Sequence, residues 1–147
     1  MTESKNCMAI PKVYRYKAKR ISDGEWMEGY YVPLFVAENK YIHRLYTGFI
    51  NESYPGEKRE SWKPVYEEID PETLCRFTGL VDNKGNPIFE SDRLTFLHRR
   101  KETCGVVQYH NGIYYVKNEV DLRDNTLFEV LIYKQAVFIN GNHHDKK

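Results

Sequence analysis

The stretch GVVQYHNGIYYVK, residues 105–117, decides the fold class, because it contains two short strand-like runs joined by Asn111-Gly112. Asn-Gly is the favoured pair for a two-residue type I′ turn, in which both central residues need positive φ. The flanking Val, Ile and Tyr residues favour extended backbone. We therefore predict a β-hairpin here, within a chain built mainly from antiparallel strands.

Short strands between turns continue through the second half of the chain. Strands are predicted over 77–81, 87–90, 93–99 and 135–139. Thr126 and Glu129 have capping-box spacing, which predicts a short helix through Lys134. This pattern indicates a small barrel, whose core we expect to contain Phe96, Val106, Tyr115 and Val137.

The first half is also predicted to be β-rich. We expect strands over 13–21, 26–37 and 41–50, with Pro33 bending the second, and a loop over 51–64. Asp70 can cap a single helical turn that starts at Pro71. The predicted organisation is a flexible arm (1–12), an N-terminal β-rich subdomain (13–74), a C-terminal barrel (75–142) and a tail (143–147).

Composition and charge restrict the classes of function. The chain has 147 residues, with 22 Lys+Arg against 21 Asp+Glu, so its net charge of +1 disfavours a strongly basic polyanion binder. No apolar stretch reaches the ~20 residues of a membrane helix, and no apolar segment follows Met1. Three widely spaced cysteines form no disulfide framework. We expect a cytoplasmic protein without a membrane partner.

Residues 77–92, FTGLVDNKGNPIFESD, resemble the central signature of the YopX family of phage and prophage proteins. The segments 14–18, 26–31 and 139–142 are similar to its opening and closing elements, although Ser91 stands where the family usually has Gly. The resemblance implies a mainly β fold with an N-terminal β layer, short helical turns and a C-terminal SH3-like barrel, in a bacterial host cell. It implies no activity. The signature residues, to which we assign structural roles, are Thr78, Gly79, Asp82, Gly85, Glu90, Asp92, Gly141 and Asn142.

Four constellations could carry chemistry, and each has a structural explanation that we favour. The turn 82–85 could cradle an anion, but it lacks a following helix. Glu90 and Asp92 would share a face of one strand, but no third ligand has suitable spacing. The run 143–145, His-His-Asp, is terminal, and Cys104 with His98 or His110 lacks an orienting residue. We therefore predict no catalytic, cofactor-binding or metal-binding residues.

Two basic clusters are candidate nucleic-acid contacts: Arg15, Lys17, Lys19 and Arg20, and Arg99, Arg100 and Lys101. Acidic residues offset both, since residues 1–74 carry 11 basic and 12 acidic side chains, and residues 75–147 carry 11 and 9. Solvated strand faces are the favoured explanation.

Nine aromatic residues crowd into positions 26–62, more than a small sheet can bury on one face. Because Tyr30 and Tyr31 are adjacent, they must point to opposite faces. The candidate interface residues are Trp26, Tyr30, Tyr31, Phe35 and Trp62. We expect a non-catalytic interaction or assembly module that forms a homo-oligomer or binds a protein partner. The alternative is a nucleic-acid-binding accessory protein of a phage.

Overall fold

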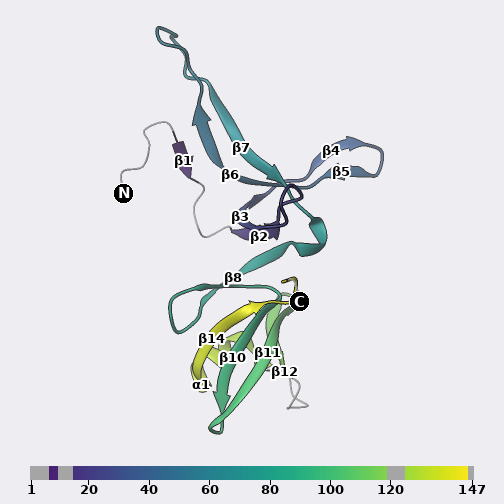
Figure 1. The fold of residues 1–147 in the computed structure, drawn as a ribbon, viewed down its shortest axis with the longest axis vertical. Helices are drawn as coiled ribbons and strands as arrows, with labels where there is room; N and C mark the ends of the chain where they lie inside the picture. The colour runs from purple at the N-terminus through teal and green to yellow at the C-terminus, as the bar shows by residue number, and fades with distance from the viewer. Residues whose placement is uncertain (1–6, 10–14, 119–124, 146–147) are drawn as a thin grey trace. The chain divides into compact units, whose positions relative to one another are not determined.

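The computed structural model describes residues 7–9, 15–118 and 125–145, and its architecture is mainly β (Figure 1). The chain divides into two compact units, Met1–Leu74 and Cys75–Lys147, called here the N-terminal and C-terminal units. Within the described residues, no helix has the length and apolar character needed to cross a membrane.

The N-terminal unit is organised around its longest strand, β6. One edge of β6 pairs with β7, while the other edge pairs with β3 through Leu45 and Tyr46 and with β1 further along. β3 also pairs with β2, and β4 pairs with β5 as a separate two-stranded sheet. The strands are β1 (Cys7–Ala9), β2 (Tyr16–Lys19), β3 (Trp26–Tyr31), β4 (Leu34–Ala37), β5 (Lys40–Ile42), β6 (Arg44–Asn51) and β7 (Trp62–Glu68).

The core of this unit is small. Ala18, Leu45 and Ile69 are fully buried, and partly buried side chains that include Tyr16 and Tyr31 pack around them. Gly29 is required beside this core, because a Cβ at that position would lie 2.5 Å from the carbonyl oxygen of Tyr46. The close approach of β3 and β6 therefore depends on a residue without a side chain.

Three predicted boundaries in this unit are wrong. The segment 26–37 forms two strands, because chain direction changes at Val32-Pro33, where Pro33 has no N–H for a ladder. The segment 41–50 is likewise divided at His43. Cys7–Ala9, predicted to lie in a flexible arm, pairs with Gly48–Ile50 of β6. A three-residue strand that forms by pairing with a distant part of the chain has too short a residue pattern to be predicted from the sequence.

The C-terminal unit contains a five-stranded antiparallel sheet in the order β13-β12-β11-β10-β14, and a β8–β9 hairpin precedes it. The strands are β8 (Cys75–Val81), β9 (Pro87–Phe89), β10 (Asp92–His98), β11 (Lys101–His110), β12 (Ile113–Asn118), β13 (Asn125–Thr126) and β14 (Gln135–Asn142). β14 is longer than predicted and includes Asn140–Asn142, because Asn142 pairs with Asp92 at the start of β10.

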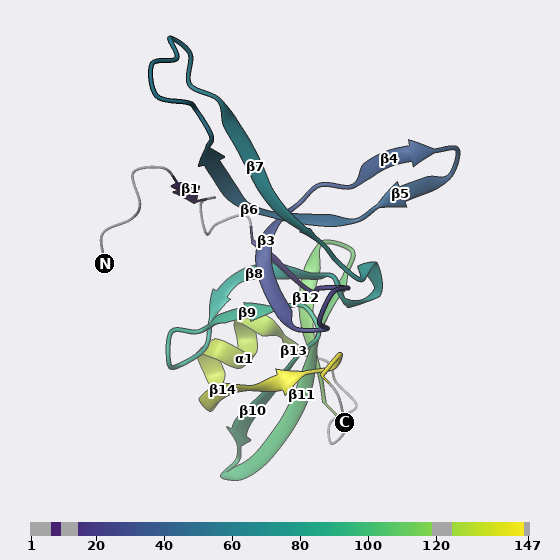
Figure 2. The ribbon, with the colours of Figure 1, turned by 45° about the horizontal axis from the view of Figure 1, so that its top comes forward.

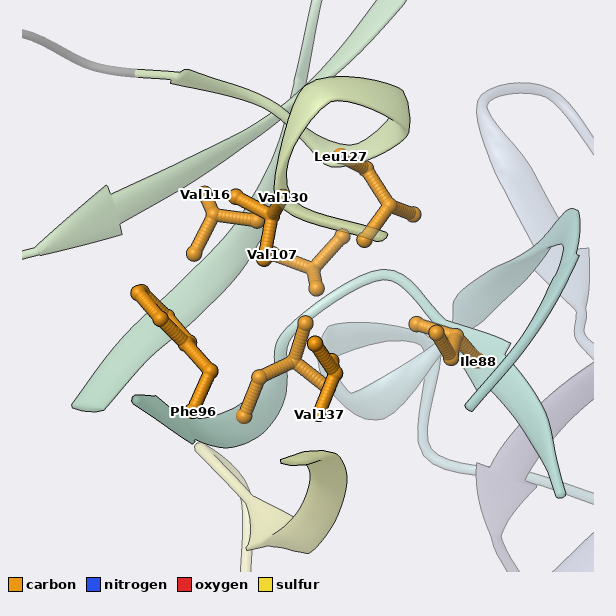
Figure 3. Packing of buried hydrophobic residues seen from close by; sticks show 8 residues of the cluster. Ile88, Phe96, Val107, Val116, Leu127, Val130 and Val137 are labelled. Atoms are coloured by element: carbon orange, nitrogen blue, oxygen red, sulfur yellow. The ribbon is translucent and has the colours of Figure 1, made fainter. Parts of the chain in front are cut away.

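The core of this unit draws side chains from five strands and one helix. Figure 3 shows Ile88, Phe96, Val107, Val116 and Val137 pointing toward one another, with Leu127 and Val130 contributed by helix α1 (Leu127–Tyr133). The prediction of Phe96 and Val137 as core residues is confirmed.

The prediction of Val106 and Tyr115 as fully buried core residues is wrong by one position. Their neighbours Val107 and Val116 face each other across β11 and β12 and are fully buried. Since side chains alternate between faces, a one-residue error in a Val-Val or Tyr-Val run exchanges the inner and outer sets.

The predicted hairpin turn and the two predicted helix caps are confirmed. Asn111 and Gly112 have φ of 50° and 83° and join paired His110 and Ile113, as a two-residue type I′ turn requires. Thr126 Oγ1 accepts the N–H of Glu129 at the start of α1. Asp70 Oδ1 accepts the N–H of Glu72 and caps the short 3-10 helix η2 (Pro71–Thr73).

Ser91 occupies the left-handed region, with φ of 70°, although it replaces the Gly of the signature. Its N–H donates to the carbonyl oxygen of Val107 at 2.7 Å, and its own carbonyl accepts from the N–H of His143 at 2.8 Å. These two backbone bonds hold the turn between β9 and β10 in a conformation that a Cβ disfavours.

Substituting Gly112 with Val should destabilise the fold by more than ~1 kcal/mol, because a β-branched residue is forced to positive φ. Urea denaturation at neutral pH would measure the change in the free energy of unfolding. The matched control is Gln108→Val, which adds the same side chain to an exposed strand position on β11 and should have little effect. An equal loss in both variants would contradict the turn assignment.

Ser91→Gly should stabilise the protein by about 0.5 kcal/mol, since relief of the left-handed strain exceeds the added entropy of the unfolded chain. Ser91→Ala retains the Cβ and should leave the free energy of unfolding nearly unchanged. Thermal and urea unfolding of both variants test this, and a destabilised Ser91→Gly variant would show that the serine side chain itself is needed.

Candidate functional site

The β4–β5 hairpin exposes apolar side chains on both of its faces. Every residue of β4 is exposed, and Phe35 retains 60% of its accessible surface. The ring of Phe35 meets that of Tyr41 edge-on, with centroids 5.6 Å apart, across a register that pairs the two residues. Figure 2 shows the hairpin extending away from the other strands of its unit. This hairpin is the candidate interaction surface.

The five candidate interface residues from the sequence do not lie together. Phe35 belongs to the hairpin, and Tyr30 is exposed on β3. Tyr31 instead packs against the unit's own core and hydrogen-bonds to His43 Nδ1 at 2.6 Å. Trp26 is half-buried beneath two lysines, and the indole N–H of Trp62 donates to Glu60. The opposite orientations expected for Tyr30 and Tyr31 are confirmed.

Sequence reasoning missed most of the hairpin's exposed residues, which are Val32, Leu34, Val36 and Tyr41. The sequence predicts one strand over 26–37, so the hairpin that follows Pro33 is not expected from it. The available signal was the turn pair Glu38-Asn39 between two apolar runs, because Asn tolerates the positive φ of 57° found there.

The N-terminal basic cluster is largely occupied by local partners. Arg15 pairs with Glu28 at 2.5 Å, and Arg20 makes two hydrogen bonds to Asp23, at 2.8 and 3.0 Å. Lys17 Nζ and Lys19 Nζ lie 4.9 and 5.4 Å from the centroid of the Trp26 ring. These contacts agree with a solvated strand face.

The C-terminal basic cluster differs, because its charges are concentrated on one tight turn. Arg99 and Arg100 form the two-residue connection between paired His98 and Lys101, at the end of β10 and the start of β11. All three basic residues are exposed, and no carboxylate among the described residues pairs with them. The two clusters lie in different units.

Asp82 of the signature forms part of the framework of the C-terminal unit. Its Oδ1 accepts the N–H groups of Lys84 and Asn86, both at 2.9 Å, and its Oδ2 accepts that of Ile139 at 3.2 Å. Burial acts to raise the pKa of Asp82, but these amide donors stabilise the carboxylate and hold the pKa below its usual value. The turn 82–85 therefore uses its carboxylate to bind its own backbone and β14.

The signature ends in a second buried polar contact. Asp92 accepts the N–H of Phe89 at 2.8 Å through Oδ2 and the side-chain amide of Asn142 at 2.9 Å through Oδ1. The other signature residues of this unit also have structural roles. Thr78 Oγ1 donates to the carbonyl oxygen of Ile88, and the glycines Gly79, Gly85 and Gly141 have positive φ. These residues hold strands together.

The expectation that Glu90 and Asp92 share a strand face is wrong. Glu90 and Ser91 form a turn between β9 and β10, so Glu90 lies outside the strand that Asp92 begins. Burial raises the pKa of Glu90, and nearby Arg76 partly offsets the effect. Asp92 instead accepts the N–H of Phe89 and the side-chain amide of Asn142, as described above.

The cysteine–histidine pairs are not brought together. Cys104 is exposed and follows buried Thr103 on β11, so it lies on the outer face of the sheet. His98 alternates with Leu94 and Phe96 on the inner face of β10. His110 is six residues from Cys104 along an extended strand, a separation of roughly 20 Å.

The observations define a mainly β protein of two antiparallel units, in which one unit carries an exposed apolar hairpin and the other is tied by buried carboxylate–amide contacts. The chain belongs to the YopX family: the model of this family, described as YopX protein, matches residues 16–146. None of the curated proteins compared matches the chain.

A solved structure has a similar fold. It is the crystal structure of protein EF1440 from Enterococcus faecalis, with 22% sequence identity and a TM-score of 0.59. The match covers 90% of this chain and 94% of the other. At this identity, the likeness concerns the fold alone.

Asp82→Asn should destabilise the protein by about 2 kcal/mol at pH 7, because a neutral amide cannot accept from all three N–H donors. The wild-type contribution is fully present above the pKa of the unfolded chain and is lost as pH falls through the lower folded pKa. Urea denaturation from pH 7 down to pH 3 should therefore show the two proteins converging. Exposed Asp23→Asn is the control and should change stability far less. A constant difference at all pH values would contradict the role of the charge.

Proposed function

We propose that this YopX-family protein is a non-catalytic interaction module that assembles with a second copy of itself through the β4–β5 hairpin. The observation that carries the proposal is the exposure of apolar side chains on both faces of a two-stranded sheet. A two-stranded hairpin by itself is marginally stable in water, so such a surface is stabilised by contact with another strand or sheet.

The hairpin also offers backbone edges. Among the described residues, β4 and β5 pair only with each other, so each has one edge with unpaired N–H and C=O groups. Exposed edges of this type recruit further strands. A two-fold axis between β4 of one copy and β4 of another would pair Leu34–Ala37 with itself and bury the same side chains on both copies. Two-fold dimers are the commonest closed assemblies, which favours a second copy as the occupant.

The small core of the N-terminal unit supports the same proposal. Among the described residues of this unit, the fully buried hydrophobic cluster consists of Ala18, Leu45 and Ile69, while five of the nine aromatics between residues 26 and 62 are exposed. Those five are Tyr30, Phe35, Tyr41, Phe49 and Tyr54. Aromatic residues are enriched at protein interfaces.

The C-terminal unit would act as the folded support of this module. We propose that its five-stranded sheet curls into an SH3-like barrel, because β14 returns to pair with β10 after the β10–β11–β12 meander and helix α1. The family resemblance further supports an origin in a phage or prophage and a location in the cytoplasm of the bacterial host.

A nucleic-acid-binding role is the second candidate, and the observation that favours it is the exposed Arg99–Lys101 turn. The N-terminal cluster adds little, because Glu28 and Asp23 already pair with its arginines. This role requires affinity for DNA or RNA that falls steeply as salt rises.

Light scattering of the wild-type chain at micromolar concentration should give about twice the 17.5 kDa mass of one chain. Phe35→Lys should shift the population to monomer, because a charge would be buried in the paired hairpins. The matched control is Tyr54→Lys, since Tyr54 is an exposed aromatic in the same unit but outside the hairpin.

A wild-type species of 17.5 kDa only would overturn the assembly proposal. So would a dimer that survives Phe35→Lys but is lost in Tyr54→Lys. Amide hydrogen exchange adds a direct measurement, because self-pairing protects residues 34–37 in the wild-type dimer and leaves them exchanging rapidly in the Phe35→Lys monomer.

A further inference from the structure

A cavity of about 350 Å³ lies at one end of the C-terminal unit, beside the β10–β11 turn. Buried Phe96 contributes an apolar wall, and Thr103, Asn118 and Asn125 contribute side chains that can hydrogen-bond. The remaining lining residues are His98, Arg99, Lys101 and Lys134. The cavity therefore combines a small apolar surface with several basic groups.

The described lining residues that carry charge are all basic. Arg99, Lys101 and Lys134 supply three cations, and no described lining residue is an Asp or Glu. Like charges gathered around one concave site raise the local concentration of anions there. Elsewhere in the chain, half-buried Arg15 and Arg20 each have a carboxylate partner.

Two of these basic groups are in direct contact. Lys134, the C-terminal cap of α1, lies against Nδ1 of His98. The Lys134 ammonium group has three N–H donors, of which this contact can use one. The contact links the end of α1 to the end of β10 and leaves Lys134 with two further N–H donors.

The turn that supplies Arg99 uses residues that its backbone disfavours. Arg99 and Arg100 have φ of 51° and 65°, in the left-handed region that costs a non-glycine residue free energy. The next turn of the same sheet has the same two-residue geometry but contains Asn111 and Gly112, the favoured pair. Strained backbone of this kind is concentrated at functional sites, which favours a role for the arginine side chains.

We propose that this cavity binds a compact oxyanion, with a phosphate group as the ligand chemistry. Lys134 and Lys101 would donate to its oxygens as point charges, and Arg99 would offer a planar pair of donors. The volume is suited to a phosphate with a small organic group attached. Assembly through the β4–β5 hairpin is independent of this site, whose residues all belong to the C-terminal unit.

The test is calorimetric titration of the full chain with inorganic phosphate at low salt. Wild type should show saturable one-site binding, and Lys134→Gln should weaken it at least about tenfold. Lys117→Gln is the matched control, because Lys117 is exposed on β12 outside the cavity, and it should bind as wild type does. Absence of saturation in the wild type, or equal weakening in both variants, would overturn the proposal.

A double variant, Arg99→Asn with Arg100→Gly, separates binding from folding. It keeps the turn and removes the strain, so the melting temperature should rise by about 5 °C while phosphate affinity falls. If the double variant and the separate Lys134→Gln variant both keep wild-type phosphate affinity, the basic groups do not form the site.

Two further titrants distinguish the source of the phosphate group. If adenosine monophosphate binds as tightly as a single-stranded oligothymidylate, the ligand of the cavity is a small phosphate compound. An oligothymidylate that binds at least about tenfold tighter, competes with phosphate and weakens steeply between about 50 and 200 mM salt indicates a nucleic-acid backbone. An oligonucleotide that binds without competing with phosphate and is unaffected by Lys134→Gln would contradict the cavity as its site.

Discussion

The buried contact between Asp92 and Asn142 is the interaction on which the C-terminal unit depends. Asp92 is fully buried at the start of β10, and the Asn142 amide donates to it from the end of β14. Because a buried carboxylate that loses a donor costs free energy, separating the first and last strands of the sheet would leave Asp92 short of one of its donors. Asp82 acts in the same way between the β8–β9 turn and β14.

The N-terminal unit follows a different principle. It has few fully buried side chains, close backbone approach at Gly29, and aromatic residues placed outward on a hairpin. Apolar surface that does not enter a core is available for association, since burial contributes roughly 25 cal/mol per Å² wherever it occurs. The C-terminal unit is held by buried polar contacts, whereas the N-terminal unit exposes apolar side chains. This difference is the physical basis of our proposal that the first half of the chain mediates assembly.

Two turns of the C-terminal sheet have the same backbone geometry but differ in how well their residues suit it. Asn111-Gly112 meets its backbone requirement with favoured residues, whereas Arg99-Arg100 meets the same requirement against the preference of both side chains. Ser91 also has positive φ, and there the two backbone hydrogen bonds of the signature turn account for it. The Arg99-Arg100 turn, whose residues disfavour its backbone, also contributes Arg99 to the lining of the basic cavity.

Local chemistry in the sequence by itself determined the mainly β class, the Asn111-Gly112 hairpin, and the caps at Asp70 and Thr126, because turn and cap geometry depends on neighbouring residues. The signature residues were also recognisable, although not their bonding partners. The tertiary structure decided which side of the Val106-Val107 pair is buried, where Trp26–Ala37 breaks, and that Lys134 joins His98 and Arg99 around one cavity. These features depend on strand register and on contacts between residues far apart in the chain, which alternation and spacing cannot specify.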